Sequence, residues 1–216
     1  MYWQDEGYLL SKNNFDENSI IIEAFTLNHG KYNGIVYGGS SRKQKKNFQV
    51  GNKILLNWKS KGQNKSGYFN TELIEPISPI YFDDKKKTSC ILSATSLLKI
   101  LLPERQINKE IYNSFEQMLH NLKSNDWINL YIYWELSLIK QLGFEVNLVN
   151  TNNTVNINNK SFPIPDFFSK NNITKYSKEK IREALIFNKN LIMENFITPN
   201  RMKFPLFRNI LESYYL

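Results

Sequence analysis

Cysteine and histidine are scarce in this sequence, which has one cysteine, Cys90, and two histidines, His29 and His120. A single cysteine cannot form an intramolecular disulfide, and a thiolate-based zinc site needs several ligands. The histidines have neither HxxxH nor HExxH spacing, and the sequence contains no P-loop and no GxGxxG segment. We therefore predict that the protein is not an enzyme and holds no metal or cofactor.

Long apolar runs are absent as well. No stretch approaches the ~18 uninterrupted apolar residues that a membrane span requires. The first residues include Asp5 and Glu6 and lack the apolar core of a signal peptide. From these two absences we expect a cytoplasmic protein.

Acidic residues are missing from one long stretch, residues 24–71, which contains nine Lys or Arg residues. The chain of 216 residues has a formal charge of +8, and outside this stretch 19 of the 28 basic residues face all 20 acidic ones. The excess positive charge is therefore concentrated in residues 24–71. At the centre of the stretch a glycine–serine turn precedes four cations within five residues: Arg42, Lys43, Lys45 and Lys46.

Such a basic stretch has two interpretations. The first is a solvated loop whose lysines only keep the protein soluble. The second is a groove for a nucleic acid, in which cations pair with phosphates while bases stack on aromatic rings. Cations on both sides of the central run and interleaved aromatic residues favour the second interpretation. These aromatic residues are Tyr32, Tyr37, Phe48, Trp58, Tyr68 and Phe69.

The first third of the chain has the pattern of strands separated by turns. We predict five strands, over residues 2–10, 19–26, 31–37, 53–58 and 67–74. Gly30 is expected to take a positive φ in the turn before the third strand. Five short strands, with the longest connection between the third and the fourth, indicate a small closed barrel of the OB type, a fold that binds oligonucleotides.

After Pro79 the apolar spacing changes from two residues to about 3.6, which indicates helices. Helical segments are predicted over residues 90–101, 107–122, 127–141, 176–196 and 204–214, whereas residues 147–159 have the composition of a loop or a weak hairpin. Cys90 lies in the first of these helical patterns, and we expect it in the core. The prediction is thus an α+β protein, with an OB-type barrel in residues 1–79 and an α-helical domain in residues 80–216.

Short segments of the chain form an ordered series that is dense at the N-terminus and sparse later. The first part of the series is Trp3-Gln-Asp-Glu-Gly7, Leu9-Leu10-Ser11, Asp16-Glu17-Asn18-Ser19, Phe25-Thr26, His29-Gly30-Lys31, and Gly34-Ile-Val-Tyr-Gly38 ahead of Ser41-Arg42-Lys43. The later part is Trp134-Glu135, Leu142-Gly143-Phe144, Pro199, Arg201, Pro205 and Arg208. In order and spacing this series resembles the RecO family of bacterial recombination mediators.

The resemblance implies a protein of the RecF pathway of DNA repair that binds single- and double-stranded DNA and anneals strands. It also implies cooperation with RecR and the single-strand-binding protein in loading RecA, and association with the nucleoid. Together with the basic stretch, it makes these residues the candidates for DNA binding: Lys31, Tyr37, Arg42, Lys43, Lys45, Lys46, Lys59, Lys61 and Lys65.

One departure from the family pattern is plain. Many members have a four-cysteine zinc knuckle after the Leu-Gly-Phe element, but residues 148–161 contain no cysteine. The resemblance therefore implies a segment held by packing alone. Two alternatives also stay open: a protein adaptor that bridges RecR and the acidic tail of the single-strand-binding protein, and an RNA-binding OB protein.

Overall fold

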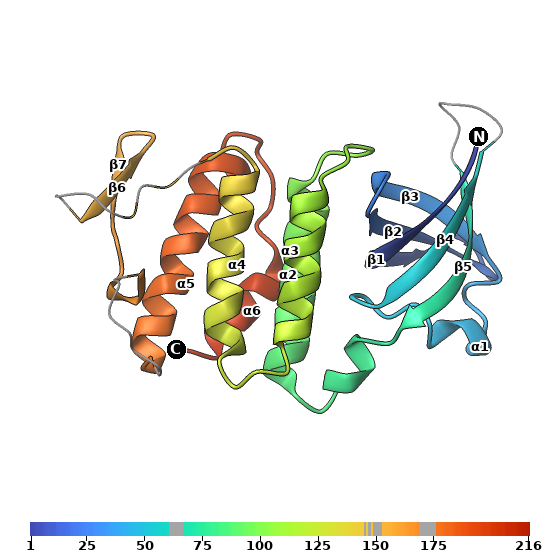
Figure 1. Ribbon diagram of the computed structural model, residues 1–216, viewed down its shortest axis with the longest axis horizontal. Helices are drawn as coiled ribbons and strands as arrows, with labels where there is room; N and C mark the ends of the chain where they lie inside the picture. Colours follow the sequence, from blue (N-terminus) through green and yellow to red (C-terminus); the bar gives the residue numbers. More distant parts are fainter. Residues whose placement is uncertain (61–66, 145, 147, 149–152, 169–175) are drawn as a thin grey trace. The chain divides into compact units, whose positions relative to one another are not determined.

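The computed structural model of the chain describes residues 1–60, 67–144, 146, 148, 153–168 and 176–216, without the side chains of Lys43 and Lys45. The chain forms two compact units, Met1–Asn113 and Ser114–Leu216, and Figure 1 shows the strands of the first unit and the helices of the second. Across these described ranges, no helix combines the length and the apolar character needed to cross a membrane.

Five strands of the first unit close into a barrel in the order β1-β2-β3-β5-β4 (Figure 1). All neighbouring pairs are antiparallel except β3 and β5, which pair in parallel with Ile35 opposite Tyr68 and so complete the barrel. This five-stranded arrangement confirms the predicted OB-type fold. The strands are β1 (Tyr2–Asn14), β2 (Ser19–Thr26), β3 (Gly30–Tyr37), β4 (Lys53–Lys59) and β5 (Tyr68–Glu75).

Alternate side chains of these strands fill the inside of the barrel. Leu9, Ile22, Leu56 and Phe69 are at most 1% exposed and belong to one apolar cluster. Gly34 leaves room for this cluster, because a Cβ atom at its position would lie 2.7 Å from the Phe69 ring. Each fully buried side chain of this size contributes about 1.5–3 kcal/mol to the free energy of unfolding. The barrel core therefore follows from the strand alternation that the sequence shows.

Helix α2 (Lys85–Leu101) belongs to the same compact unit as the barrel. It begins after Asp84, whose side chain accepts hydrogen bonds from two backbone N–H groups of the first turn. Near its end, Lys99 pairs with Glu23 of β2 at 2.7 Å, and Lys31 of β3 donates from Nζ to the Lys99 carbonyl at 2.6 Å. The compact unit thus continues past the last strand to Asn113, while the division into domains at residues 79 and 80 stays a prediction.

The turn before β3 lies close to the segment that follows α2. Gly30 has a φ of 75°, as predicted. A Cβ atom at Gly30 would lie 2.2 Å from the backbone oxygen of Gln106, and the Arg105 N–H donates to the Lys31 carbonyl at 2.9 Å. The His29-Gly30-Lys31 element therefore needs glycine both for its backbone conformation and for this close backbone approach.

The remaining part of the chain is mainly helical, as predicted. Residues 154–163 form a hairpin, which is one of the two structures expected near this position. Gly143, which follows the helix over Trp127–Gln141, has a φ of 97°. The elements are α3 (Lys109–Asn121), α4 (Trp127–Gln141), β6 (Thr154–Ile157), β7 (Lys160–Pro163), α5 (Lys178–Ile192), the π-helical turn η3 (Met193–Ile197) and α6 (Leu206–Ser213), with short 3-10 turns η1 (Ser78–Tyr81) and η2 (Asp166–Phe168).

A buried ion pair joins α4, α5 and α6 in the second unit. The side chains of Glu135 and Arg208 are both 0% exposed, and Arg208 Nη2 lies 3.1 Å from Glu135 Oε2. Glu135 also accepts hydrogen bonds from the Tyr131 hydroxyl at 2.6 Å and from Asn188 Nδ2 at 3.3 Å, while Arg208 donates to the Leu185 carbonyl at 2.7 Å. Burial by itself lowers the pKa of Arg208, but the Glu135 charge outweighs burial and raises it.

Candidate nucleic-acid interface

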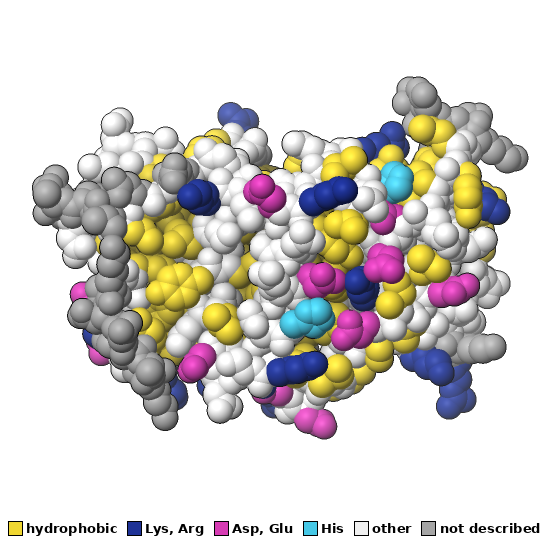
Figure 2. All heavy atoms as spheres, viewed as in Figure 1, with side chains coloured by type: hydrophobic (Ala, Val, Ile, Leu, Met, Phe, Trp, Pro, Cys, Tyr) yellow, Lys and Arg dark blue, Asp and Glu magenta, His cyan; other side chains and the backbone are white. Residues whose placement is uncertain are grey.

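The four clustered cations lie in and directly after one helical turn, α1 (Arg42–Lys45). Gly38 precedes this turn with a φ of 72°, a conformation that glycine adopts readily. Arg42 and Lys46 are exposed. Figure 2 shows Lys and Arg side chains at the end of the barrel where Figure 1 labels α1. The structure therefore presents at least part of the predicted basic cluster to solvent.

A second exposed surface crosses four strands of the barrel. Tyr2 of β1 lies opposite Lys59 of β4, and Lys59 lies opposite Tyr68 of β5. The Tyr68 ring is in turn 6.0 Å from the ring of Tyr37 in β3. We call these four residues the Tyr–Lys row. The sequence made Lys59 and Tyr37 candidate site residues and placed Tyr68 only among the interleaved aromatic residues, whereas Tyr2 is added by the pairing of the strands.

The side chains of the Tyr–Lys row are accessible. Tyr2 is 62% exposed and Tyr37 is 66% exposed. Lys59 Nζ lies 5.7 Å from the centre of the Tyr2 ring, within the range of a cation–π contact. Exposed rings with a cation between them can stack bases and pair with the phosphate backbone at the same time.

Half of the interleaved aromatic residues lie inside the barrel. Phe48, Trp58 and Phe69 are 1–2% exposed, so they pack in the core. Tyr37 is exposed, and Tyr68 is partly exposed. Strand alternation explains the difference, because successive side chains of a strand point to opposite faces. Trp58 therefore points inward, and its neighbour Lys59 points outward.

Lys31 is buried, unlike the other candidates whose side chains the structure describes. It is only 8% exposed, and its Nζ donates to the Lys99 carbonyl. Burial lowers the pKa of Lys31, although the charges of Glu23 and Glu104 act in the opposite direction. Its position in the structure is therefore that of a residue that joins β3 to α2, not of an exposed phosphate contact. Two further candidates, Lys61 and Lys65, lie outside the described residues.

Asp5 fixes the turn between β2 and β3. Its carboxylate accepts hydrogen bonds from the Asn28 N–H at 2.7 Å and the Asn28 amide at 3.0 Å, and it lies 2.9 Å from His29 Nδ1. The His29 ring stacks on Trp3, with 4.1 Å between the ring centres. Burial by itself raises the pKa of Asp5, but these hydrogen bonds, His29 first, outweigh it and lower the pKa. His29 thus has a structural partner in the turn where it was predicted.

We expect Asp5→Asn to lower the free energy of unfolding by about 1.5–3 kcal/mol at neutral pH, because hydrogen bonds to a charged acceptor are lost. The pKa of Asp5 is lower in the folded chain than its unfolded value of ~3.9. The charged Asp5 therefore contributes fully to the free energy of unfolding above that pH. This contribution is lost as the pH falls through the folded pKa. Urea unfolding between pH 7 and pH 2 should show the difference between parent and variant shrinking in acid. Asp83→Asn, at an exposed position, is the matched control.

Groups that could bind a metal do not gather among the residues that the structure describes. No set of three His, Cys, Asp or Glu side chains there has the arrangement of a metal site. Cys90 is buried in α2, and His120 lies in the last turn of α3. The site described above consists instead of cations and aromatic rings.

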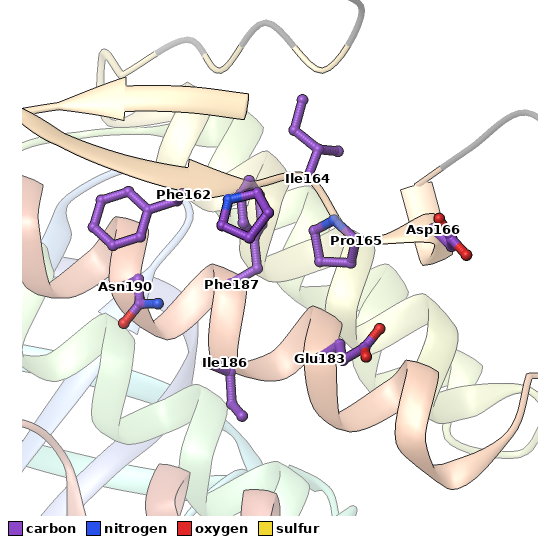
Figure 3. Close-up of a pocket in the computed structure, with 9 residues that line it drawn as sticks. Phe162, Ile164, Pro165, Asp166, Glu183, Ile186, Phe187 and Asn190 are labelled. Carbon is purple, nitrogen blue, oxygen red and sulfur yellow. The ribbon is translucent and has the colours of Figure 1, made fainter. Parts of the chain in front are cut away.

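A hollow of about 440 Å³ in the second unit has a different character. It lies between the segment from β7 to η2 and helix α5, and Figure 3 draws the carboxylates of Asp166 and Glu183 at one end of it. Asp166 Oδ2 lies 3.6 Å from Lys180 Nζ. The rest of the lining is mostly apolar, with Ile164 and Phe187. An apolar hollow with carboxylates at its edge is not suited to a phosphate backbone.

The barrel topology and the exposed cations and tyrosines define a protein with an OB-type domain, a class whose members bind oligonucleotides. Residues 1–77 match the family model described as Recombination protein O N terminal, and residues 83–154 match Recombination protein O C terminal. The chain belongs to the RecO family, which confirms the resemblance. Residues after 154 lie outside both matches.

Relatives with the name DNA repair protein RecO align with about two thirds of this chain. The relative from Wolbachia sp. subsp. Drosophila simulans (strain wRi) is 33% identical over 150 residues, which cover 68% of this chain and 62% of the relative. The relative from Dinoroseobacter shibae is 34% identical over 147 residues, which cover 68% of this chain and 61% of the relative. The chain thus spans less than two thirds of the length of these relatives.

Proposed function

We propose that this chain binds single- and double-stranded DNA through its barrel and acts in recombinational DNA repair as a non-enzymatic mediator. Its role is to bring complementary strands together and anneal them. It cooperates with RecR and the single-strand-binding protein in loading RecA onto protein-coated single strands. It acts in the cytoplasm, at the nucleoid. Membership of the RecO family supports this proposal, as do the names of the relatives.

The observations that carry the proposal are the exposed Tyr–Lys row and the exposed cations of α1, both on the barrel unit. Two strands of DNA repel each other through their phosphates, so a surface that neutralises phosphates lowers the barrier to pairing. Exposed tyrosine rings hold unpaired bases by stacking without reading their sequence. A protein that anneals any pair of complementary strands needs both properties.

Two other functions make different predictions. An adaptor that only bridges RecR and the single-strand-binding protein would bind DNA only when those partners are present. The hollow below β7 is a poor site for the acidic tail of the single-strand-binding protein, because Asp166 and Glu183 would repel it. An RNA-binding OB protein would prefer RNA over DNA of the same sequence, through contacts with the 2′-hydroxyl.

Annealing of complementary oligonucleotides, naked and protein-coated, tests the proposal directly. We expect faster annealing with this chain, and binding of naked DNA without partners at moderate salt. If about four phosphates are neutralised, the logarithm of the single-strand affinity should fall against the logarithm of salt with a slope near −3. A flat salt response, or binding that appears only with partners, would contradict the proposal.

Replacing both Tyr37 and Tyr68 with leucine is expected to weaken single-strand binding by at least about thirtyfold, since base–aromatic stacking contributes about 1–3 kcal/mol per base and two rings are removed. Double-stranded DNA, whose bases are already stacked, should lose much less affinity. Because no charge changes, the salt slope should stay as in the parent. Fluorescence anisotropy with labelled single and double strands measures all three effects.

Phe82→Leu is the matched control for this variant, because Phe82 is 56% exposed and lies outside the Tyr–Lys row. It should bind both forms of DNA like the parent. Equal losses for single and double strands in the row variant would show that the tyrosines support the fold or the charges and do not stack bases.

A further inference from the structure

A pocket of about 310 Å³ opens at the end of the barrel next to the basic turn. Its residues come from the end of β1, the start of β2 and the segment after β3: Lys12, Asn13, Asn14, Ile20, Gly39, Ser40 and Phe48. We propose that this pocket receives one unstacked nucleobase of a bound single strand. The inference rests on the proposed function, and it adds a specific base site to the phosphate and stacking contacts.

The inside of the pocket suits the flat faces of a base. Ile20 and Phe48 are 4% and 1% exposed and form an apolar lining. Gly39 packs tightly beside them, since a Cβ atom there would lie 2.7 Å from the Ile20 side chain. Pockets that receive an unstacked base are lined in this way by apolar and aromatic groups.

The rim of the pocket suits the polar edge of a base. The Asn13 and Asn14 side chains are exposed and make no hydrogen bond within the described part of the chain. Each amide offers both a donor and an acceptor, so it can pair with the edge of more than one base. Of the described residues that line the pocket, Lys12 is a cation and none is a carboxylate. A base with its phosphate therefore fits better than an acidic ligand or a purely apolar side chain.

The position of the pocket places it on the path of a bound strand. Gly39 follows Tyr37, the β3 member of the Tyr–Lys row, by two residues, and Ser40 precedes Arg42 of α1 by two residues. Two residues of extended chain span at most about 7 Å, which is the rise of roughly two nucleotides. A strand that stacks on Tyr37 and pairs with Arg42 thus passes the pocket.

Nuclear magnetic resonance of the Ile20 methyl groups in the full chain tests this proposal. The probes are a short single-stranded oligodeoxythymidylate and an abasic oligonucleotide of equal length and charge. We expect both to bind through phosphate contacts, with the abasic strand weaker. Only the strand with bases should shift the Ile20 methyl signals, because a base in the pocket adds a ring current. Ile54, in the barrel core but not in the pocket, is the control signal.

A variant with both Asn13→Ala and Asn14→Ala supplies a second measurement. Both side chains are exposed, so the fold should be retained. We expect affinity for the strand with bases to fall about tenfold, as two hydrogen-bonding groups are lost, and affinity for the abasic strand to stay unchanged. Asn113→Ala, at an exposed position of α3, should change neither.

The outcomes separate this inference from the proposed function. If the strand binds but the Ile20 signals do not move, the pocket holds no base, whereas DNA binding stands. If both probes move the Ile20 signals equally, the pocket receives sugar or phosphate, and the inference is overturned. If neither probe binds, both the inference and the proposed function fail.

Discussion

Arg208→Met is expected to lower the free energy of unfolding by about 3–5 kcal/mol, because it leaves the Glu135 charge buried without its cation. Glu135 is 0% exposed, so water cannot replace the lost partner. The Tyr131 hydroxyl and the Asn188 amide still donate to it, but neither carries a charge. The Leu185 carbonyl also loses its donor. Urea unfolding followed by helical circular dichroism measures the loss.

A double variant distinguishes a broken ion pair from lost packing. When Glu135→Leu and Arg208→Met are combined, no buried charge is left, so the combined cost should be smaller than the sum of the two single costs by at least about 1 kcal/mol. Arg182→Met removes an exposed arginine of α5 and should change stability by less than about 0.5 kcal/mol. Strict additivity of the two core variants would show that the pair contributes no coupling.

This ion pair shows what the sequence could and could not predict. Glu135 and Arg208 both belong to segments that resemble the RecO family, yet nothing in the sequence indicates that they are partners. They are 73 residues apart, and hydrophobic periodicity carries no information about a contact between polar residues on different helices. The limits of α4 itself were predicted, because its apolar residues and the glycine after its end, Gly143, are local signals.

The barrel was predictable for the same local reason. Strand alternation and turn residues lie within a few positions of each other, and together they specify five strands and an OB-type order. The docking of α2 was not predictable, because it depends on Lys99 pairing with Glu23 and on the Lys31 side chain donating to the Lys99 carbonyl. The sequence marks the change from strand to helix but not which helix packs with the barrel.

The candidate site was predicted by charge, and charge alone does not show burial. Lys31 and Tyr37 lie in the same strand with the same alternation, so both point away from the barrel core. At Tyr37 this outer face is open, whereas at Lys31 the segment after α2 covers it, with the Arg105 N–H bonded to the Lys31 carbonyl. Tyr2 could have been found by extending the alternation from Trp3, which packs against the barrel core, to the neighbouring outward position. Tyr68, already one of the interleaved aromatic residues, follows in the same way from Phe69.

Charge reversal of the basic cluster tests whether α1 is part of the DNA surface. We expect the variant with Arg42, Lys43, Lys45 and Lys46 all replaced by glutamate to lose single-strand affinity by several hundredfold at 0.1 M salt. The estimate follows from four lost phosphate contacts, each of which contributes about 0.7 to the salt slope. The slope should become shallower by about 3 for the same reason. Annealing of complementary strands should fall in parallel.

The fold should survive this change, and the matched control separates a local effect from net charge. Arg42 and Lys46 are exposed, and acidic residues are favoured in the first turn of a helix. The control replaces four exposed cations of the second unit with glutamate, which alters the formal charge of +8 by the same amount: Lys178, Arg182, Arg201 and Lys203. It should retain most of its DNA affinity. If the α1 variant melts and anneals like the parent while the control loses both binding and annealing, α1 is a solvated turn and the DNA surface lies in the second unit.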